Sequence, residues 1–165
     1  MTITVYHVGM VVSDLDRSIR FYTEGLGLEC EEVFEADGEM LSNVVGVPDA
    51  RMRVASLVAD DGVLFVIVQY LNPPTTVRPF EDQAERTSTG SAHVAFMVPS
   101  IQKTYKKLVK MGATAVNPPI ETRPGHLNCY MQDPDGNWIE LVQDATHAAT
   151  PFRIRQGRVR PNQKA

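Results

Sequence analysis

The sequence predicts an α+β protein built from two tandem βαβββ modules. Two observations carry this prediction. The segment HVGMVVSDLDRSIRFYTEGLG, which starts at His7, aligns with HVAFMVPSIQKTYKKLVKMGA, which starts at His93, at a constant offset of 86 residues. Each copy opens with a β-branched apolar run, continues at helical spacing, and is followed by two apolar strands joined at a turn that contains glycine.

In the first module, a strand that includes His7 leads to a helix that begins at Ser13-Asp14 and ends at Gly25 to Gly27. The elements expected after this helix are, in order, a strand near Leu28 to Val33, a short extra helix over Glu39 to Val45, and a hairpin of Arg51 to Ala59 with Leu64 to Leu71.

The second module repeats this order from His93, with a helix that begins at Pro99-Ser100 and ends at Gly112. A strand near Ala113 to Val116 and a hairpin of Leu127 to Gln132 with Asn137 to Gln143 complete it. The chain therefore divides into a first module (1–71), a proline-rich linker (72–90), a second module (91–144) and a basic tail (145–165).

Composition and charge exclude several classes of protein. The formal net charge is −4, and five basic residues after Ala145, with no acidic residue among them, leave −9 on the rest of the chain. An acidic body lacks the basic stripe that a nucleic-acid face needs. No apolar stretch approaches the roughly 20 residues of a membrane span, and the first ten residues lack a basic signal-peptide start, so we expect a cytoplasmic protein. Cys30 and Cys129 are expected to be buried thiols.

Strand alternation nominates a site, because residues two apart share a face. His7 shares its face with Gly9 and Val11, which leaves Tyr6, Val8 and Met10 to pack on the helix side, and His93 is placed in the same way in the second copy. Glu140 interrupts an apolar strand in which Ile139 and Leu141 face the opposite layer, and it needs a partner if it is buried. Two imidazoles and a carboxylate on one face suit Fe, Mn, Co, Ni or Zn and leave positions open for substrate. The alternative is two core histidines with satisfied hydrogen bonds and an ion-paired glutamate.

Polar side chains alternate along the strand before Asp133-Pro134, which is typical of a pocket wall or of a solvated face. On this face we expect Asn128 and Tyr130 to contact substrate, together with Trp138 from the next strand and Arg123 from the preceding loop. His126 is the candidate for a second proton-transfer group, since histidine titrates near neutral pH.

Three segments give the chain a family resemblance: HVGMVVSDLDRSIRFYTEGLGL at His7, SAHVAFMV at His93 and YMQDPDGNWIELVQ at Tyr130. Over about Thr2 to Gln143 the chain resembles the vicinal oxygen chelate superfamily, which includes glyoxalase I, methylmalonyl-CoA epimerases, fosfomycin-resistance transferases, extradiol dioxygenases and bleomycin-sequestering proteins. The resemblance implies a curved mixed-sheet cleft, a divalent metal held by His7, His93 and Glu140, a small-molecule substrate and a homodimer. The modules would pair within one chain or by exchange across the dimer.

The fourth metal position departs from glyoxalase I, which has a glutamate on the last strand of its first half. Here that strand is LFVIVQYL. If Asp61-Gly62 is aligned with Asp135-Gly136, Val66 takes the position equivalent to Glu140. If the distance to Pro73 is matched instead, Gln69 falls where the epimerases have a ligand glutamine. Gln69 is therefore a candidate fourth ligand.

The implied chemistry is stabilisation of an enolate on a metal that chelates two adjacent substrate oxygens, with Glu140 or His126 moving the proton. We expect an isomerase, an epimerase or a glyoxalase-type lyase. The alternatives are an Fe(II) extradiol dioxygenase on the same triad, a fosfomycin-type thiol transferase, and a drug- or metabolite-binding protein without turnover.

Overall fold

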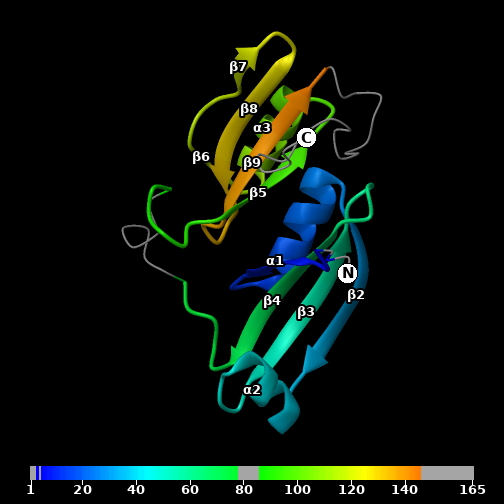
Figure 1. Ribbon diagram of the computed structural model, residues 1–165, viewed down its shortest axis with the longest axis vertical. Helices are drawn as coiled ribbons and strands as arrows, with labels where there is room; N and C mark the ends of the chain where they lie inside the picture. Colours follow the sequence, from blue (N-terminus) through cyan, green and yellow to red (C-terminus); the bar gives the residue numbers. More distant parts are fainter. Residues whose placement is uncertain (1–2, 4, 78–85, 146–165) are drawn as a thin grey trace, which may run out of the picture.

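The computed structural model describes residues 3, 5–77 and 86–145, which form two sheets (Figure 1). The first sheet has the order β1-β4-β3-β2, with β1 (Val8–Val11), β2 (Glu29–Ala36), β3 (Arg51–Val58) and β4 (Leu64–Asn72). The second has the order β5-β9-β8-β6, with β5 (His93–Met97), β6 (Thr114–Ala115), β8 (His126–Gln132) and β9 (Trp138–Asp144). The predicted α+β fold is confirmed. The curved cleft stays a prediction.

Each module carries its main helix at the predicted place. The helices are α1 (Leu15–Arg20), which continues into the π-helical turn η1 (Phe21–Gly25), and α3 (Ile101–Lys110), and the extra helix α2 (Glu39–Val45) lies in the first module as expected. Asp14 caps α1, because its side chain accepts a hydrogen bond from the Arg17 backbone N–H. None of the helices in the described ranges is long and apolar enough to span a membrane.

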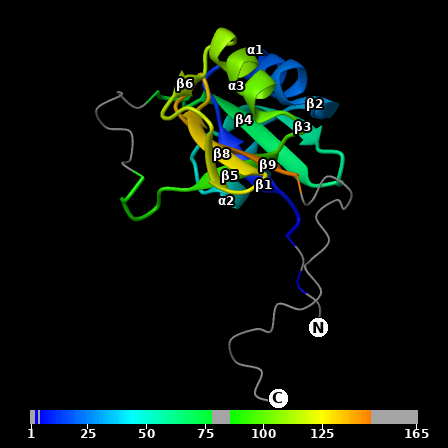
Figure 2. The ribbon, with the colours of Figure 1, turned by 90° about the horizontal axis from the view of Figure 1, so that it is seen from above.

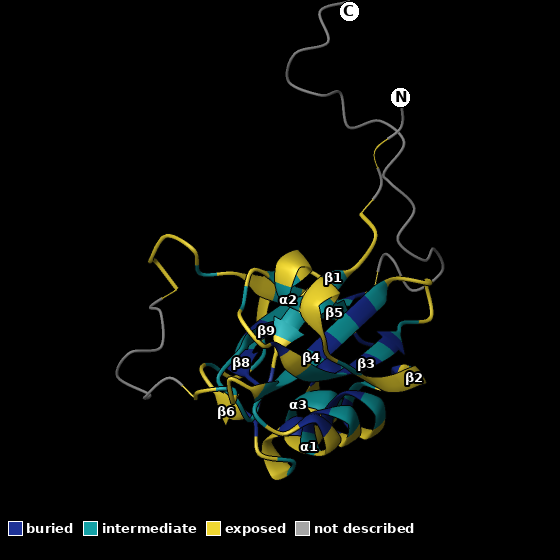
Figure 3. Cartoon of the chain, turned by 90° about the horizontal axis from the view of Figure 1, so that it is seen from below, coloured by how far each residue is buried: buried dark blue, intermediate teal, exposed yellow. Residues whose placement is uncertain are grey.

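The two main helices pack against each other on the same side of the sheets (Figures 2 and 3). Gly25 at the end of η1 makes this approach possible, because a Cβ atom there would lie 2.5 Å from Leu108 Cδ2 on α3. The Phe65 ring of the first module meets the rings of Tyr22 and of Phe96 from the second module edge to face, with centroids 4.8 Å apart for Tyr22–Phe65 and 5.9 Å for Phe65–Phe96. Both modules thus share one core.

A polar cluster also joins the modules, at the turn between β8 and β9. The Tyr22 hydroxyl donates a hydrogen bond to Asp133 Oδ2 at 2.9 Å, and the Arg17 guanidinium pairs with Asp135 Oδ1 at 2.7 Å. Ser13 also donates to Asp135. Burial raises the pKa of Asp133, and its hydrogen bonds with Asn137 and Tyr22 oppose this rise. The sequence predicted this segment only as a hairpin turn, whereas in the fold it also holds α1 of the other module.

The second module differs from the predicted order in one strand. Where the first module has the continuous strand β2, the second has β6 and, after a break, an additional strand β7 (Ile120–Arg123), and both pair with β8. Pro118 and Pro119 lie in this break, and proline has no N–H to donate to a sheet. Residues 78–85 of the predicted linker and 146–165 of the predicted basic tail lie outside the described residues.

Candidate functional site

The open face of the second sheet brings together His93 and Glu140. These residues lie on the neighbouring parallel strands β5 and β9, and His93 Nε2 lies 3.4 Å from Glu140 Oε2. The other carboxylate oxygen, Oε1, accepts a hydrogen bond from Asn128 Nδ2 on β8 at 3.0 Å. The Glu140 side chain is 13% exposed, whereas Ile139 and Leu141 face the core as predicted. The carboxylate is therefore oriented on both of its oxygens.

Tyr130 extends this face. It is paired with Glu140 across β8 and β9, and its ring meets the His93 ring edge-on with centroids 5.3 Å apart. Burial raises the pKa of the Tyr130 hydroxyl, and a hydrogen bond with the Glu140 carboxylate raises it further. The hydroxyl therefore stays protonated near neutral pH. The structure thus places Tyr130 and Asn128 beside the His93–Glu140 pair.

Arg86 adds a positive charge that the sequence analysis did not find. Its guanidinium carbon lies 3.2 Å from the Tyr130 ring centroid and 5.5 Å from that of Trp138. Both distances are within the range of cation–π attraction. Arg86 belongs to the predicted linker, where no periodic pattern connects it with strands more than forty residues later. Only the folded arrangement relates it to the site.

His7 does not join the pair within one chain. It is exposed, immediately before β1, and its ring contacts Tyr6 with centroids 5.4 Å apart. Tyr6 itself is 81% exposed, so the expectation that it packs on the helix side is wrong, whereas Val8 and Met10 do pack there. Among residues 3, 5–77 and 86–145, no three His, Cys, Asp or Glu side chains lie close enough together to hold a metal ion.

The pairing of the strands decides between the two registers for the fourth position. Gly9 of β1 is opposite Val66, and Ala95 of β5 is opposite Glu140, so Val66 is the structural counterpart of Glu140. Gln69 corresponds instead to Gln143. The Gln69 side chain accepts from the Leu15 N–H at 3.1 Å and donates to the Ser13 carbonyl at 2.9 Å. These bonds argue against a ligand role for Gln69, because both its amide oxygen and its amide nitrogen are hydrogen-bonded to the backbone at the start of α1.

Two other predicted site residues, His126 at the start of β8 and Arg123 at the end of β7, lie away from Glu140. His126 is four residues from Tyr130, about 13 Å along a β-strand, and its Nδ1 lies 3.0 Å from Thr122 Oγ1. Arg123 pairs with Asp144 at 3.0 Å. This separation argues against a proton-transfer role for His126 at Glu140, and the ion pair occupies Arg123.

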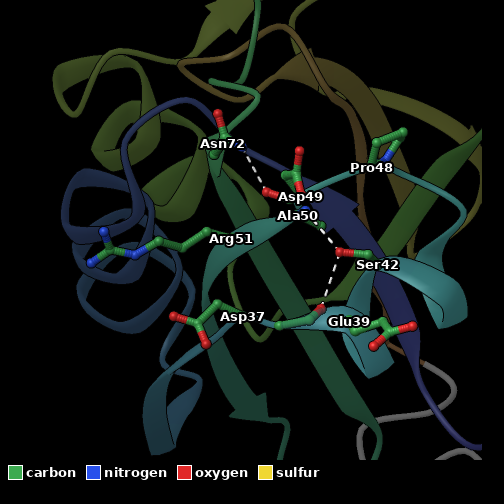
Figure 4. Close-up of a pocket in the computed structure, with 9 residues that line it drawn as sticks. Asp37, Glu39, Ser42, Pro48, Asp49, Ala50, Arg51 and Asn72 are labelled. Atoms are coloured by element: carbon green, nitrogen blue, oxygen red, sulfur yellow. Dashed lines mark hydrogen bonds between the residues drawn. The ribbon is translucent and has the colours of Figure 1, made fainter.

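A cavity of about 540 Å³ lies in the first module beside α2 (Figure 4). Hydrogen bonds tie its wall together: the Ser42 hydroxyl donates to the Gly38 carbonyl and accepts from the Ala50 N–H, each at 3.0 Å, and Asn72 donates to the Asp49 carbonyl at 2.6 Å. The remaining lining side chains include acids and one arginine, Arg51, which pairs with Glu35. No predicted site residue lines this cavity.

The two cysteines are both free. Cys129 is buried, and burial, with a contribution from Glu140, raises the pKa of its thiol to about 11. Cys30 is only partly buried, so the prediction of two buried thiols is confirmed for Cys129 alone. A thiol with so high a pKa is a poor nucleophile at neutral pH, so Cys129 serves packing rather than chemistry.

Comparison with curated proteins finds distant relatives. The chain is 29% identical over 140 residues to the uncharacterized protein YwbC of Bacillus subtilis, which covers 83% of this chain and 94% of that protein. It is 25% identical over 147 residues to lactoylglutathione lyase of Schizosaccharomyces pombe, which covers 87% of this chain and 48% of that enzyme. The chain thus spans about half the length of this lyase.

Solved structures and a family model also match the chain. A glyoxalase family protein from Bacillus cereus has a TM-score of 0.78 and 27% identity, covering 87% of this chain and 96% of that one. Glyoxalase I of Leishmania major has a TM-score of 0.61 at 21% identity, covering 88% and 89%, which shows the shared fold. The family model matches residues 4–141, and the chain therefore belongs to the Glyoxalase/Bleomycin resistance protein/Dioxygenase superfamily.

Proposed function

We propose that this protein is a metal-dependent enzyme that binds two adjacent oxygens of a small substrate, with His7, His93 and Glu140 as metal ligands. The 3.4 Å separation of His93 Nε2 and Glu140 Oε2 carries the proposal. Two donor atoms that bind one first-row divalent ion at about 2.1 Å and at right angles lie roughly 3.0 Å apart, so these side chains fit a common ion with little movement. The hydrogen bond from Asn128 to Glu140 is the kind that orients a ligand carboxylate.

The third ligand comes from a second copy of the chain. His7 is exposed and does not lie with His93 and Glu140 in its own chain. The residues around it are apolar and exposed: Ile3 is 92% and Val5 83% accessible, and Val11, which shares the His7 face, is 49% accessible. A partner that covers this segment would remove apolar surface from water. A homodimer whose sites each take His7 from one subunit supplies that partner.

The reaction we propose is proton transfer next to a carbonyl, as in an isomerase, an epimerase or a glyoxalase-type lyase. A divalent ion in this site would act as a Lewis acid toward the chelated oxygens. Glu140 is the carboxylate on this face, and Asn128 holds it in place to accept and return the proton. The Tyr130 hydroxyl, on the ring that contacts His93, would donate a hydrogen bond to a substrate oxygen. The distant relationship to lactoylglutathione lyase supports this class.

The first experiment measures metal content by elemental analysis of protein purified without chelator. About one ion of Mn, Fe, Co, Ni or Zn per chain is expected in the wild type, and its loss in His7→Ala, His93→Ala and Glu140→Ala. His126→Ala is the matched control, a histidine on the same strand system that should leave metal binding intact. Retention of metal in all three ligand variants would refute the proposed site. Bound iron would favour the dioxygenase alternative.

A second experiment tests whether the site is shared between chains. Co-expression of His7→Ala and His93→Ala chains with different affinity tags allows the mixed dimer to be isolated. If each site takes His7 from one chain and His93 from the other, the mixed dimer regains one intact site and binds half the wild-type metal. If every site lies within one chain, both sites of the mixed dimer are damaged and no metal is recovered.

A further inference from the structure

Arg86 differs from the other arginines that contact the sheets. Arg17, Arg51, Arg53 and Arg123 each form an ion pair with a carboxylate. Within the part of the chain that the structure describes, no ion pair includes Arg86, and its guanidinium lies instead on the Tyr130 ring, 3.2 Å from the centroid. Among the described residues, its charge thus lies against an aromatic surface and is not paired with an acid.

Stacking leaves most of the guanidinium available for a ligand. The guanidinium has five N–H donors in its own plane, and contact between that plane and a ring face uses none of them. These donors form the planar fork that binds a carboxylate through two parallel hydrogen bonds. Arg86 is an exposed residue, so a ligand can reach this fork.

The position of Arg86 relates this fork to the proposed metal ligands. The Tyr130 ring contacts the His93 ring with centroids 5.3 Å apart, so Arg86 and His93 contact the same tyrosine ring. A substrate of a few carbon atoms spans the distance between the Arg86 guanidinium and the His93 ring. Trp138, 5.5 Å from the guanidinium carbon, gives this space a second aromatic wall.

We infer that Arg86 is a specificity-determining residue that selects substrates with a carboxylate a few carbon atoms from the two chelated oxygens. This inference rests on the proposed function, because it places the chelated oxygens at His93 and Glu140. Arg86 binds the remote carboxylate, Tyr130 and Trp138 position the guanidinium, and the chemistry stays at Glu140. Substrates that lack this remote carboxylate bind more weakly, because the Arg86 guanidinium then has no anionic partner.

The test compares two probes on the metal-loaded full-length protein. 2-Oxoglutarate and 2-oxopentanoate share a 2-oxo acid group and five carbon atoms, and only 2-oxoglutarate ends in a second carboxylate. Isothermal titration calorimetry gives the two affinities. Trp138 is the one tryptophan of the sequence, so its fluorescence reports whether binding occurs at this face. We expect the wild type to prefer 2-oxoglutarate by about tenfold or more.

Three variants locate the origin of that preference. Arg86→Gln should abolish it while leaving metal content and 2-oxopentanoate affinity unchanged. Arg86→Lys should keep part of it, because lysine retains the charge without the planar fork. Arg20→Gln, an exposed arginine on α1, is the matched control and should keep all of it.

The possible failures can be told apart. A wild type that binds metal but shows no preference, or a preference that survives Arg86→Gln, overturns the role of Arg86 and leaves the proposed function standing. Absence of bound metal in the wild type, measured separately by elemental analysis, overturns the proposed function and with it this inference.

Discussion

The two modules share a scaffold and differ in the chemistry of their open faces. In each, a glutamine on the last strand accepts a hydrogen bond from the first helical residue: Gln69 from Leu15 at 3.1 Å, and Gln143 from Ile101 at 2.8 Å. The positions of Tyr130 and Glu140 in the second module are occupied by Ser56 and Val66 in the first, because these residues are paired in the same way. The backbone of this fold therefore constrains the capping positions more tightly than the open face.

Replacing Glu140 by valine makes the second module resemble the first at this position. Of the substitutions proposed here, it should cause the largest change, a loss of metal affinity. We expect Glu140→Val to lower metal affinity at least about 100-fold, since a ligand is lost and not only its supporting hydrogen bond. Competition with a chelator measures this change. The fold should persist, because Val66 occupies the equivalent position, and a cooperative thermal transition checks that. Undiminished metal affinity would show that the modules do not differ in the way we infer.

Removing the hydroxyl of Tyr22 tests how far the modules depend on each other. Tyr22→Phe leaves buried Asp133 without one of its hydrogen bonds and should lower the free energy of unfolding by about 1–3 kcal/mol. Urea denaturation measures the loss. Tyr105→Phe on α3 is the control and should change stability by less than about 0.5 kcal/mol. Equal effects of the two substitutions would mean that the link between modules contributes little.

The paired glutamines allow a matched comparison of the two halves. Gln69→Leu and Gln143→Leu each remove the hydrogen bond that satisfies the first N–H of a helix and should each cost about 1 kcal/mol in the free energy of unfolding. Metal content should be unchanged in Gln69→Leu. Loss of metal in this variant, with the fold retained, would restore Gln69 as a ligand.

The smallest effect is expected at the surface ion pair between Arg53 and Asp16, which sits on the first module alone. A hydrogen bond from Arg53 lowers the pKa of Asp16 below its ordinary value of 3.8. The pair therefore stabilises the fold above that value, and the stabilisation disappears as pH falls through the lowered pKa. Because Asp16 is largely exposed, Arg53→Gln should cost only a few tenths of a kcal/mol at pH 7, about 0.5 at most.

The cost of Arg53→Gln should vanish once the pH has fallen below the lowered pKa of Asp16, and it should shrink in high salt, as denaturation at several pH values would measure. A cost that stays constant with pH would assign the effect to packing of the Arg53 side chain and not to its charge.

The repeat made much of the fold predictable from sequence. Apolar alternation placed Ile139 and Leu141 in the core and Glu140 on the opposite face. The spacing after Asp135-Gly136 gave one of two possible registers, the one in which Val66 is the counterpart of Glu140, and the strand pairing selects it. Gln69 could not be assigned from sequence, since its two hydrogen bonds reach residues more than fifty positions earlier.

Arg86 and His126 show why site prediction is harder than fold prediction. Whether each residue reaches the site depends on where it lies along a strand or across the sheet. His126 shares the periodicity of Tyr130 but lies too far along the same strand, because alternation specifies a face and not a distance. Arg86 has no periodicity at all, and its contact with Tyr130 depends on the path of the connecting segment.

The strand order has a consequence for how the protein is made. In each sheet the strand that is synthesised last lies inside: β4 between β1 and β3, and β9 between β5 and β8. During translation, β5 therefore has no partner strand, and β8 has only β6 and β7, until Trp138 to Asp144 have left the ribosome. A nascent chain that stops earlier exposes the unpaired β5 and one edge of β8 to proteases, and it also lacks the carboxylate that faces His93. Completion of the second sheet and completion of its proposed metal-binding face are thus the same event.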